Sequence, residues 1–354
     1  MAWLLRIFGL LLMLSALAIP LMRAPDRPVE TLVARWAPPP SDFIELDGQL
    51  VHYRDQGPRS DAAPIVLLHG SSASLHTWEG WAHALSGKRR VISLDLPAFG
   101  LTGPFAGRYA GQSYTGDNYA RFVLDLLDRL AVQRFVIGGN SLGGEVAWRI
   151  AAAAPQRVAA LVLVDASGYA FEPGSIPLGW RIARLPVIGR ISEHLLPRPL
   201  IVQGLHAVYG DIMQINEPLV DRYFELTLRE GNRAALVQRA QTWTPGEGVD
   251  HVVGVSAPTL ILWGGRDRLM PPALAQRFAA DIPGSRMQVF DRLGHAPQEE
   301  DPAATVAVVQ AFLADVADAT GAAGAAGTAG VSGATAPAPR PASARASPPA
   351  STAR

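Results

Sequence analysis

The residues with the clearest chemical potential are a serine, an aspartate and a histidine, which occur in that order along the chain. Ser141 is the centre of a Gly-x-Ser-x-Gly pattern at 139–143, which follows an apolar run and precedes an alanine-rich helical pattern at 145–154. A tight strand-to-helix turn exposes a serine oxygen, and glycines tolerate the crowding that such a turn creates. The N–H groups at the start of the helix add a positive dipole end beside the serine. We therefore interpret Ser141 as a nucleophile, because its context strengthens a pattern that is weak by itself.

A nucleophilic serine needs a general base nearby, and eight histidines are available in this chain. His295 lies in 293–297 (L-G-H-A-P), in the loop between the last predicted strand and the last predicted helix. The preceding glycine gives this loop the freedom to aim the imidazole ring, so His295 is the predicted base. His69 also follows a predicted strand, but we interpret it as a structural histidine before Gly70.

The base in turn needs a carboxylate that orients it. Asp267 follows the penultimate predicted strand in 263–268 (W-G-G-R-D-R) and is the predicted acid. Asp165 stands at the end of another predicted strand and is the rival, with a turn-capping role as its alternative. The order Ser141, Asp267, His295 is the order expected for a triad on a strand–turn–helix scaffold.

An oxyanion that develops on the substrate needs preorganised N–H donors. Leu142, the residue after the nucleophile, provides one backbone N–H, and Ser71 in the loop at 69–72 (H-G-S-S) provides the other. The Ser71 hydroxyl either assists there or caps its own loop. Glu145, four residues after the serine, is expected to face a polar neighbour near the helix start and to take no part in catalysis.

The elements that must position these residues alternate between strand and helix. Short, fully apolar strands separated by helix-length segments predict a buried parallel sheet, and therefore an α/β fold. Between 119 and 130, apolar residues recur at the spacing of an amphipathic helix. A β-hairpin turning at Asp47-Gly48 is predicted ahead of the sheet, at 43–46 and 50–54. The predicted parallel strands cover 64–68, 90–94, 134–137, 160–164, 258–263 and 286–290.

One interval of about 90 residues, between the strands ending at Val164 and starting near Pro258, breaks this alternation. Its pattern is helical, interrupted by prolines, with no obvious strand of the sheet type. An inserted helical subdomain is the expected interpretation.

Both ends of the chain differ from its middle. Residues 1–23 contain an apolar run at 7–22, which predicts a membrane anchor or, alternatively, a signal peptide cleaved near Ala18. The proline-rich stretch 24–41 predicts an extended spacer. Residues 319–354 consist mostly of Ala, Gly, Pro, Ser and Thr, which predicts a disordered tail. We expect a catalytic domain anchored to a bacterial inner membrane and facing the periplasm, or an exported protein if the segment is cleaved.

Charge and composition exclude several functions. Formal net charge is zero, but the basic ends leave residues 26–318 with 26 bases and 31 acids. This acidic middle has no aromatic-studded basic patch, so no nucleic-acid partner is expected. The absence of cysteine excludes disulfides, Cys nucleophiles and Cys-ligated metals. The single lysine, Lys88, is not in a P-loop, and a Schiff base on it is not expected.

With these residues identified, the chain resembles the α/β-hydrolase superfamily over about 42–312. It is most similar to capped bacterial members with a serine nucleophile, including the serine carbon–carbon bond (meta-cleavage product) hydrolases and esterases. Related dehalogenases and epoxide hydrolases carry Asp at the nucleophile position, so Ser141 argues against both. The segments that carry the resemblance are 67–70 (L-L-H-G), 95–100 (D-L-P-A-F-G), 139–144 (G-N-S-L-G-G), 263–267 (W-G-G-R-D) and 294–295 (G-H).

The resemblance implies a hydrolase core at 42–167 and 251–318, with a mostly parallel sheet flanked by helices. It also implies that 168–250 forms a helical lid over a pocket above Ser141. Five aromatic residues either line that pocket or belong to the ordinary core: Trp78, Trp81, Trp180, Phe224 and Trp243.

The expected function is hydrolysis of a carboxylic ester or related acyl bond, through an acyl-enzyme on Ser141. His295 would act as general base and then as general acid, while Asp267 holds its tautomer. The expected partner is a small, apolar acyl or ester substrate, and no metal or organic cofactor is implied. Carbon–carbon hydrolysis of a diketone-like substrate and cofactor-free perhydrolysis are alternatives within enzymes. A binding protein on an inactive hydrolase scaffold is the alternative outside them, and the oligomeric state stays open.

Overall fold

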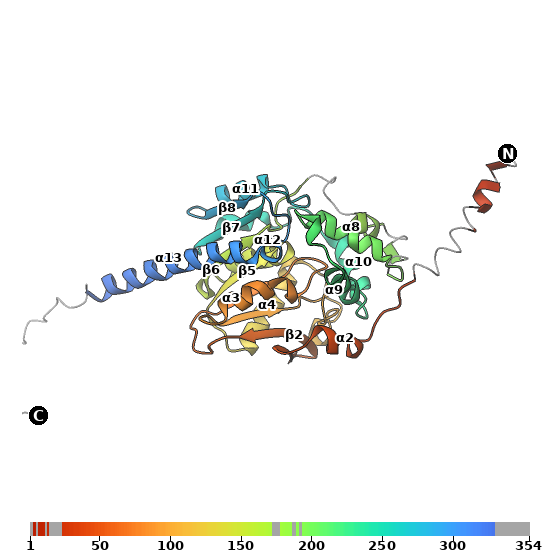
Figure 1. The fold of residues 1–354 in the computed structure, drawn as a ribbon. Helices are drawn as coiled ribbons and strands as arrows, with labels where there is room; N and C mark the ends of the chain where they lie inside the picture. The colour runs from red at the N-terminus through yellow and green to blue at the C-terminus, as the bar shows by residue number, and fades with distance from the viewer. Residues whose placement is uncertain are drawn as a thin grey trace, which may run out of the picture. The chain divides into compact units, whose positions relative to one another are not determined.

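The structure of this chain is a computed structural model that divides into two compact units, Met1–Leu313 and Ala314–Arg354. The first unit holds the sheet and the helices around it (Figure 1). Most of the predicted membrane segment at 7–22 lies outside the described residues. Those residues are 3–4, 6–10, 13, 23–171, 178–185, 189–190 and 193–329.

An eight-stranded mixed sheet forms the centre of the first unit, in the order β1-β2-β4-β3-β5-β6-β7-β8. Strand β2 is antiparallel to both of its neighbours, β1 and β4. From β4 to β8 in this order, all neighbouring strands are parallel to one another. The α/β fold with a mostly parallel sheet, predicted from the sequence, is confirmed. The strands are β1 Ser41–Leu46, β2 Gln49–Gln56, β3 Ile65–Leu68, β4 Val91–Leu94, β5 Phe135–Asn140, β6 Val158–Val164, β7 Thr259–Gly264 and β8 Arg286–Phe290.

Helices flank this sheet. Helix α5 packs against β3, β5 and β6, and α4 packs against α5, while α11 packs against β7 and β8. Strands β3, β5 and β7 are buried along their whole length, as the fully apolar runs in the sequence predicted. The helices of the sheet layers are α3 Glu79–Leu85, α4 Gly116–Arg129, α5 Leu142–Ala153, α11 Ala273–Asp281, α12 Pro297–Glu300 and α13 Pro302–Ala329.

The interval between β6 and β7 folds into helices in its described part, where a helical insertion was predicted. Residues 172–177, 186–188 and 191–192 of this interval lie outside the described residues. We call the helices of this insertion the lid helices. They are α6 Leu178–Ala183, α8 Arg198–Val208, α9 Glu217–Thr227 and α10 Asn232–Thr242.

Residues 23–36, which we call the strap, differ from the extended spacer that the prolines suggested. The strap contains helix α2 (Glu30–Trp36), whose flanking prolines lie outside the helix and bound it. Its Leu32 is 1% exposed and packs with Leu101 and with Leu226 of α9. The prediction of an extended spacer was therefore wrong for this segment. It was based on the prolines alone and did not consider that Leu32 could be buried against the lid.

Polar contacts also hold the strap on the lid helices. The Arg27 N–H donates to the Leu228 carbonyl at 2.7 Å. The Arg35 guanidinium pairs with Asp221 at 2.7 Å and with Glu225 at 2.9 Å, both on α9. The strap is thus joined to α9 by ionic and apolar contacts, and to Leu228 directly after α9 by a backbone hydrogen bond.

The C-terminal end also differs in part from the prediction. Helix α13 continues to Ala329, whereas disorder was predicted from 319. Alanine has the highest helix propensity, so an alanine-rich run directly after a helix extends that helix. Residues 330–354 lie outside the described residues, and the prediction for them stays a prediction.

Among the described residues, one helical stretch, Pro302–Ala319 of α13, is long and apolar enough to match a membrane span, and 28% of it is buried. Val306, Val309 and Phe312 of this stretch are buried in the first unit.

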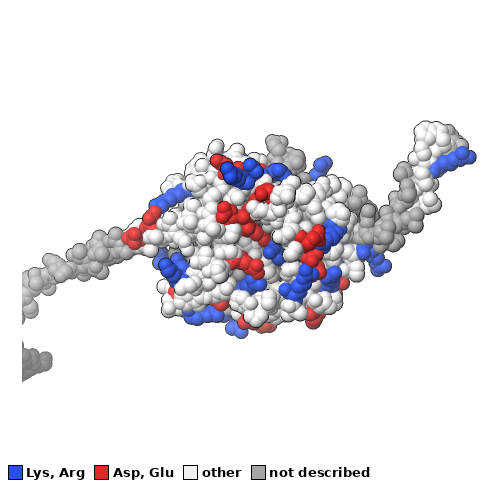
Figure 2. All heavy atoms as spheres, in the orientation of Figure 1, with Lys and Arg blue, Asp and Glu red and all other residues white. Residues whose placement is uncertain are grey.

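Figure 2 shows that basic and acidic side chains are interspersed on the face it displays. Side chains of opposite charge are paired at several points in the described part of the chain, such as Arg108 with Asp47 at 2.9 Å and Arg157 with Asp128 at 2.8 Å. This mixed pattern suits the near-balanced charge of the middle of the chain.

The turn between β5 and α5 generates a stability prediction. A Cβ atom on Gly143 would lie 2.1 Å from the Leu68 carbonyl oxygen, a backbone atom that cannot move aside. We expect Gly143→Ala to lower the free energy of unfolding by about 2–3 kcal/mol or more, measured by urea denaturation. Gly204→Ala is the matched control, because Gly204 of α8 has open space around its Cβ position. The control should be neutral or stabilising by about 0.5–1 kcal/mol, and equal losses would contradict the prediction.

Candidate active site

Ser141 lies at the turn between β5 and α5, as the sequence predicted. Its backbone has φ 54° and ψ −115°, a strained conformation for a residue with a side chain. A Cβ atom on Gly139 would lie 2.1 Å from the Gly143 carbonyl oxygen, so the glycines on both sides are needed for this turn. The serine itself is 8% exposed and lines a cavity.

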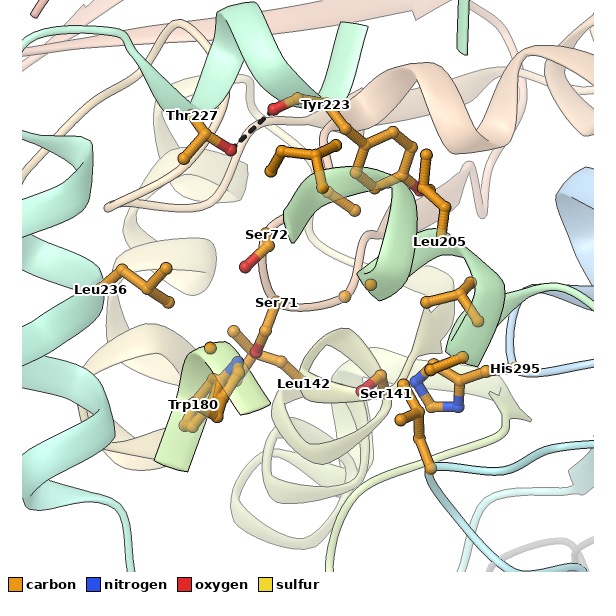
Figure 3. A pocket seen from close by; sticks show the side chains of 18 of the residues that line it. Ser71, Ser72, Ser141, Leu142, Trp180, Leu205, Tyr223, Thr227, Leu236 and His295 are labelled. Carbon is orange, nitrogen blue, oxygen red and sulfur yellow. Dashed lines mark hydrogen bonds between the residues drawn. The ribbon is translucent and has the colours of Figure 1, made fainter. Parts of the chain in front are cut away.

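His295 and Asp267 meet beside this turn. The His295 Nδ1 and Asp267 Oδ2 atoms lie 2.7 Å apart. Asp267 is fixed by its second oxygen, Oδ1, which accepts the N–H groups of Leu269 at 2.7 Å and Met270 at 2.9 Å. With Nδ1 facing the carboxylate, Nε2 is the ring nitrogen left to serve Ser141. Figure 3 shows the His295 ring next to Ser141 in the wall of the cavity.

Asn140, which the sequence analysis did not single out, links the serine turn to the histidine loop. Its side-chain amide donates to the His295 carbonyl at 2.8 Å and to the Val164 carbonyl at 3.2 Å. The sequence shows that Asn140 precedes the nucleophile. It does not show the hydrogen bond to His295, because the two residues are 155 positions apart and no local pattern indicates the contact.

Glu300 is a second residue that the sequence analysis missed. Its buried carboxylate accepts the N–H of Gly294 at 2.7 Å and the N–H of Gly210 at 2.8 Å. His295, which follows Gly294 in the chain, donates its backbone N–H to the Val208 carbonyl at 2.6 Å. Glu300 therefore joins the histidine loop to the end of lid helix α8, and burial raises the pKa of this carboxyl group.

Asp165, the rival acid, lies beside the predicted one. It is fully buried, and its Oδ1 accepts the Gly264 N–H at 2.9 Å. Its Oδ2 accepts no N–H group among the described residues, and its side chain lies within hydrogen-bonding reach of Asp267. Burial, and then the neighbouring charge of Asp267, raise the pKa of Asp165 well above its ordinary value. We interpret Asp165 as the protonated member of a carboxyl pair, while Asp267 holds the contact to His295.

One group of side chains in the described part of the chain has the composition and spacing to ligate a metal ion. It consists of Asp165, Asp267 and His295. Their potential ligand atoms lie within 4.8 Å of one another. An ion there would compete with the hydrogen bonds that already occupy both oxygens of Asp267 and Nδ1 of His295. The arrangement suits a hydrogen-bonded acid–base chain better than a metal centre.

His69 has the geometry of a structural residue, as the sequence analysis interpreted it. Its Nε2 accepts the Leu96 N–H at 2.9 Å, so Nδ1 carries the proton and donates to the Gly70 carbonyl at 2.7 Å. Burial lowers the pKa of His69, which keeps the ring neutral. Both ring nitrogens are occupied, which leaves neither free for a catalytic role.

The two predicted oxyanion donors lie in the same cavity as the serine. Leu142 is the first residue of α5, so its N–H has no partner within the helix. Ser71 follows Gly70, whose Cβ position would lie 3.1 Å from the Ser141 Cβ atom. Ser71, Leu142 and Ser141 all line the cavity, and Figure 3 shows Ser71 and Leu142 on the opposite side of Ser141 from His295.

The cavity has a volume of about 500 Å³ and lies between Ser141 and the lid helices. Of the five aromatic residues considered above, Trp180 and Trp243 line it. Trp78 and Trp81 are fully buried in the core and Phe224 is not part of the lining, so a pocket role for these three is wrong. Aliphatic side chains supply most of the remaining wall, among them Leu178, Leu200, Ile201, Leu205, Leu236 and Val237.

Comparison with known proteins agrees with this fold. Residues 65–308 match the alpha/beta hydrolase family, and the chain belongs to that family. An uncharacterised protein of Mycobacterium tuberculosis is 30% identical over 294 residues, covering 78% of this chain and 82% of its own. A 2-hydroxy-6-oxononadienedioate/2-hydroxy-6-oxononatrienedioate hydrolase of Cupriavidus pinatubonensis is 29% identical over 278 residues, covering 75% and 91%.

Solved structures share the fold at lower identity. A bacterial membrane phospholipase A, described as a virulence factor, superposes with a TM-score of 0.66 at 24% identity, over 89% of this chain and 99% of its own. Esterases, lipases and meta-cleavage product hydrolases are among the other distant relatives.

The raised pKa of Asp165 predicts a pH dependence of stability. When the pKa of a carboxyl group is higher in the folded than in the unfolded protein, its contribution to stability is fully present below the unfolded-state pKa, which is about 4 for Asp. This contribution is lost as pH rises through the folded-state pKa. Asp165→Asn removes the titration and keeps the shape of the side chain. We expect the wild type to lose free energy of unfolding relative to this variant as pH rises above about 4, measured by urea denaturation. A difference that stays constant with pH would show that Asp165 does not hold a proton in the folded protein.

Proposed function

We propose that this protein is a serine hydrolase that cleaves a carboxylic ester or a related acyl bond. The observation that carries the proposal is the 2.7 Å contact between His295 and Asp267, beside a strained serine at the wall of an apolar cavity. A serine held at positive φ costs about 1–3 kcal/mol, a strain that is typical of functional sites.

In the proposed reaction, His295 removes the proton of Ser141 while the serine oxygen attacks the substrate carbonyl carbon. The negative charge on the carbonyl oxygen is stabilised by the N–H groups of Leu142 and Ser71. His295 then protonates the leaving alcohol, which departs and leaves an acyl group on Ser141. Water, activated by the same histidine, hydrolyses this acyl-enzyme, and Asp267 stabilises the imidazolium ion in both halves of the cycle.

Carbon–carbon hydrolysis is the second candidate. It is supported by relatives that are named 2-hydroxy-6-oxo acid hydrolases and are 29% identical to this chain. The same serine, histidine and aspartate would be required, so the residues of the site do not separate the two reactions. The aliphatic lining of the cavity suits the apolar part of either substrate.

The test of both reactions is covalent labelling. A fluorophosphonate should label the wild type on Ser141 and should not label Ser141→Ala, because the reagent needs an activated serine. Hydrolysis of p-nitrophenyl esters should fall by about 10³-fold or more in Ser141→Ala, and Asp267→Asn should also lose most turnover. An unlabelled wild type would contradict the hydrolase proposal and favour a binding protein on an inactive scaffold. If a 2-hydroxy-6-oxo-dienoate is cleaved much faster than any ester, the carbon–carbon reaction is favoured instead.

We further propose that the apolar segment at 7–22 attaches the protein to a bacterial membrane. Its length and composition support this, as does the similarity in fold to a membrane phospholipase A. In fractionated cells, the full chain should sediment with membranes and resist alkaline extraction. A variant without 2–22 should be soluble, because it lacks the apolar segment. A mature protein that begins near Ile19 and stays in the soluble fraction would instead support a cleaved signal peptide.

A further inference from the structure

The cavity above Ser141 is unevenly charged. Among the described residues that line it are three arginines, Arg233, Arg239 and Arg268, and no aspartate or glutamate. The wall is otherwise mostly apolar, so a charge placed there is poorly solvated. A buried cation in an apolar wall is costly unless a partner of opposite charge is present.

The three arginines differ in how well they are already neutralised. Arg233 is paired with Asp26 of the strap at 2.6 Å. Arg268 is exposed, and one of its guanidinium nitrogens donates to the His206 carbonyl at 2.7 Å. Arg239, on α10, is 2% exposed, so it must find its partners inside the protein.

Those partners satisfy Arg239 incompletely. Its Nη1 donates to the Tyr114 carbonyl at 2.8 Å, and its Nε has no hydrogen-bond partner among the described residues. Its Nη2 lies 3.9 Å from Glu145 Oε2, which is beyond hydrogen-bonding distance. Glu145 is moreover shared, because its other oxygen accepts a hydrogen bond from Arg149 at 3.2 Å.

Aromatic rings hold the guanidinium in place at the cavity wall. Its central carbon lies 5.4 Å from the centre of the Tyr119 ring and 5.9 Å from that of Trp180. Figure 3 shows Trp180 on the side of the cavity away from His295, with Leu142 and Ser71 between them. The guanidinium is therefore positioned by its neighbours while part of its donor capacity stays unused.

We propose that Arg239 binds an anionic group of the substrate, a carboxylate or a phosphate, at the end of the cavity opposite His295. This inference rests on the proposed hydrolase function. The substrate is then an amphiphilic ester, with its scissile carbonyl at Ser141, an apolar body against the aliphatic wall and a negative charge at Arg239. A guanidinium suits this task because its planar donors match two anionic oxygens.

The test compares pairs of esters in which one member carries an anionic group and the other lacks it. For the carboxylate arm, mono-p-nitrophenyl suberate is anionic and p-nitrophenyl octanoate is neutral. For the phosphate arm, 1-octanoylglycerol 3-phosphate is compared with 1-octanoylglycerol. We expect the wild type to prefer the anionic member of at least one pair in kcat/KM. Arg239→Gln should lower kcat/KM for that member by about 10- to 100-fold, the effect of one charged hydrogen bond, and change the neutral member by less than about threefold.

Two variants serve as controls. Arg239→Lys keeps the charge and should retain part of the preference. Arg268→Gln removes another arginine of the same cavity and should leave the preference unchanged.

Three results would overturn the inference: no preference for either anionic ester in the wild type, an equal loss on both members of a pair in Arg239→Gln, or loss of the preference in Arg268→Gln. The first of these needs no variant, so misfolding of a variant cannot obscure it. Fluorophosphonate labelling runs in parallel. If the wild type is labelled on Ser141 but does not prefer the anionic esters, this inference alone is contradicted. If the wild type is not labelled, the hydrolase proposal is contradicted.

Discussion

The close contact between the start of helix α5 and the end of strand β3 is the constraint on which the site depends. Because Gly143 has no side chain, the first turn of α5 can approach the Leu68 carbonyl and hold Ser141 at positive φ. The same approach brings the loop after β3, with Gly70 and Ser71, against the serine. Donor groups from two segments about 70 residues apart thus converge on one atom. A helix held even 1 Å further away would separate them, and catalysis is sensitive to such displacements.

The parts of the fold that the sequence predicted are those with local signals. Apolar runs bounded by glycine, proline and aspartate identified the buried parallel strands of the sheet, because a strand covered by helices on both faces needs no polar face. Ser141, Asp267 and His295 were recognisable for a related reason. Each follows a strand, and the carboxyl ends of parallel strands lie at the same edge of a sheet. Their pairing could therefore be inferred before any distance was known.

The parts that the sequence did not predict depend on contacts between distant segments. Glu300 follows His295 closely in sequence, yet its carboxylate also binds Gly210 of the lid, 90 residues away. Nothing in its neighbourhood distinguishes it from a surface glutamate at a helix start. Trp78 was equally ambiguous, because a tryptophan pattern does not reveal whether the ring faces a cavity or the core. Asp165 could be placed at a strand end, but only the sheet order shows that it neighbours Asp267.

The strap has a consequence for the order of events during synthesis. Arg35 pairs with Glu225, so its partner emerges from the ribosome 190 residues later. At about 5–20 residues per second, the strap waits roughly 10–40 s before it can dock. Docking of the strap on α9 is accordingly a late step, because it must wait until the whole of α9 has been synthesised.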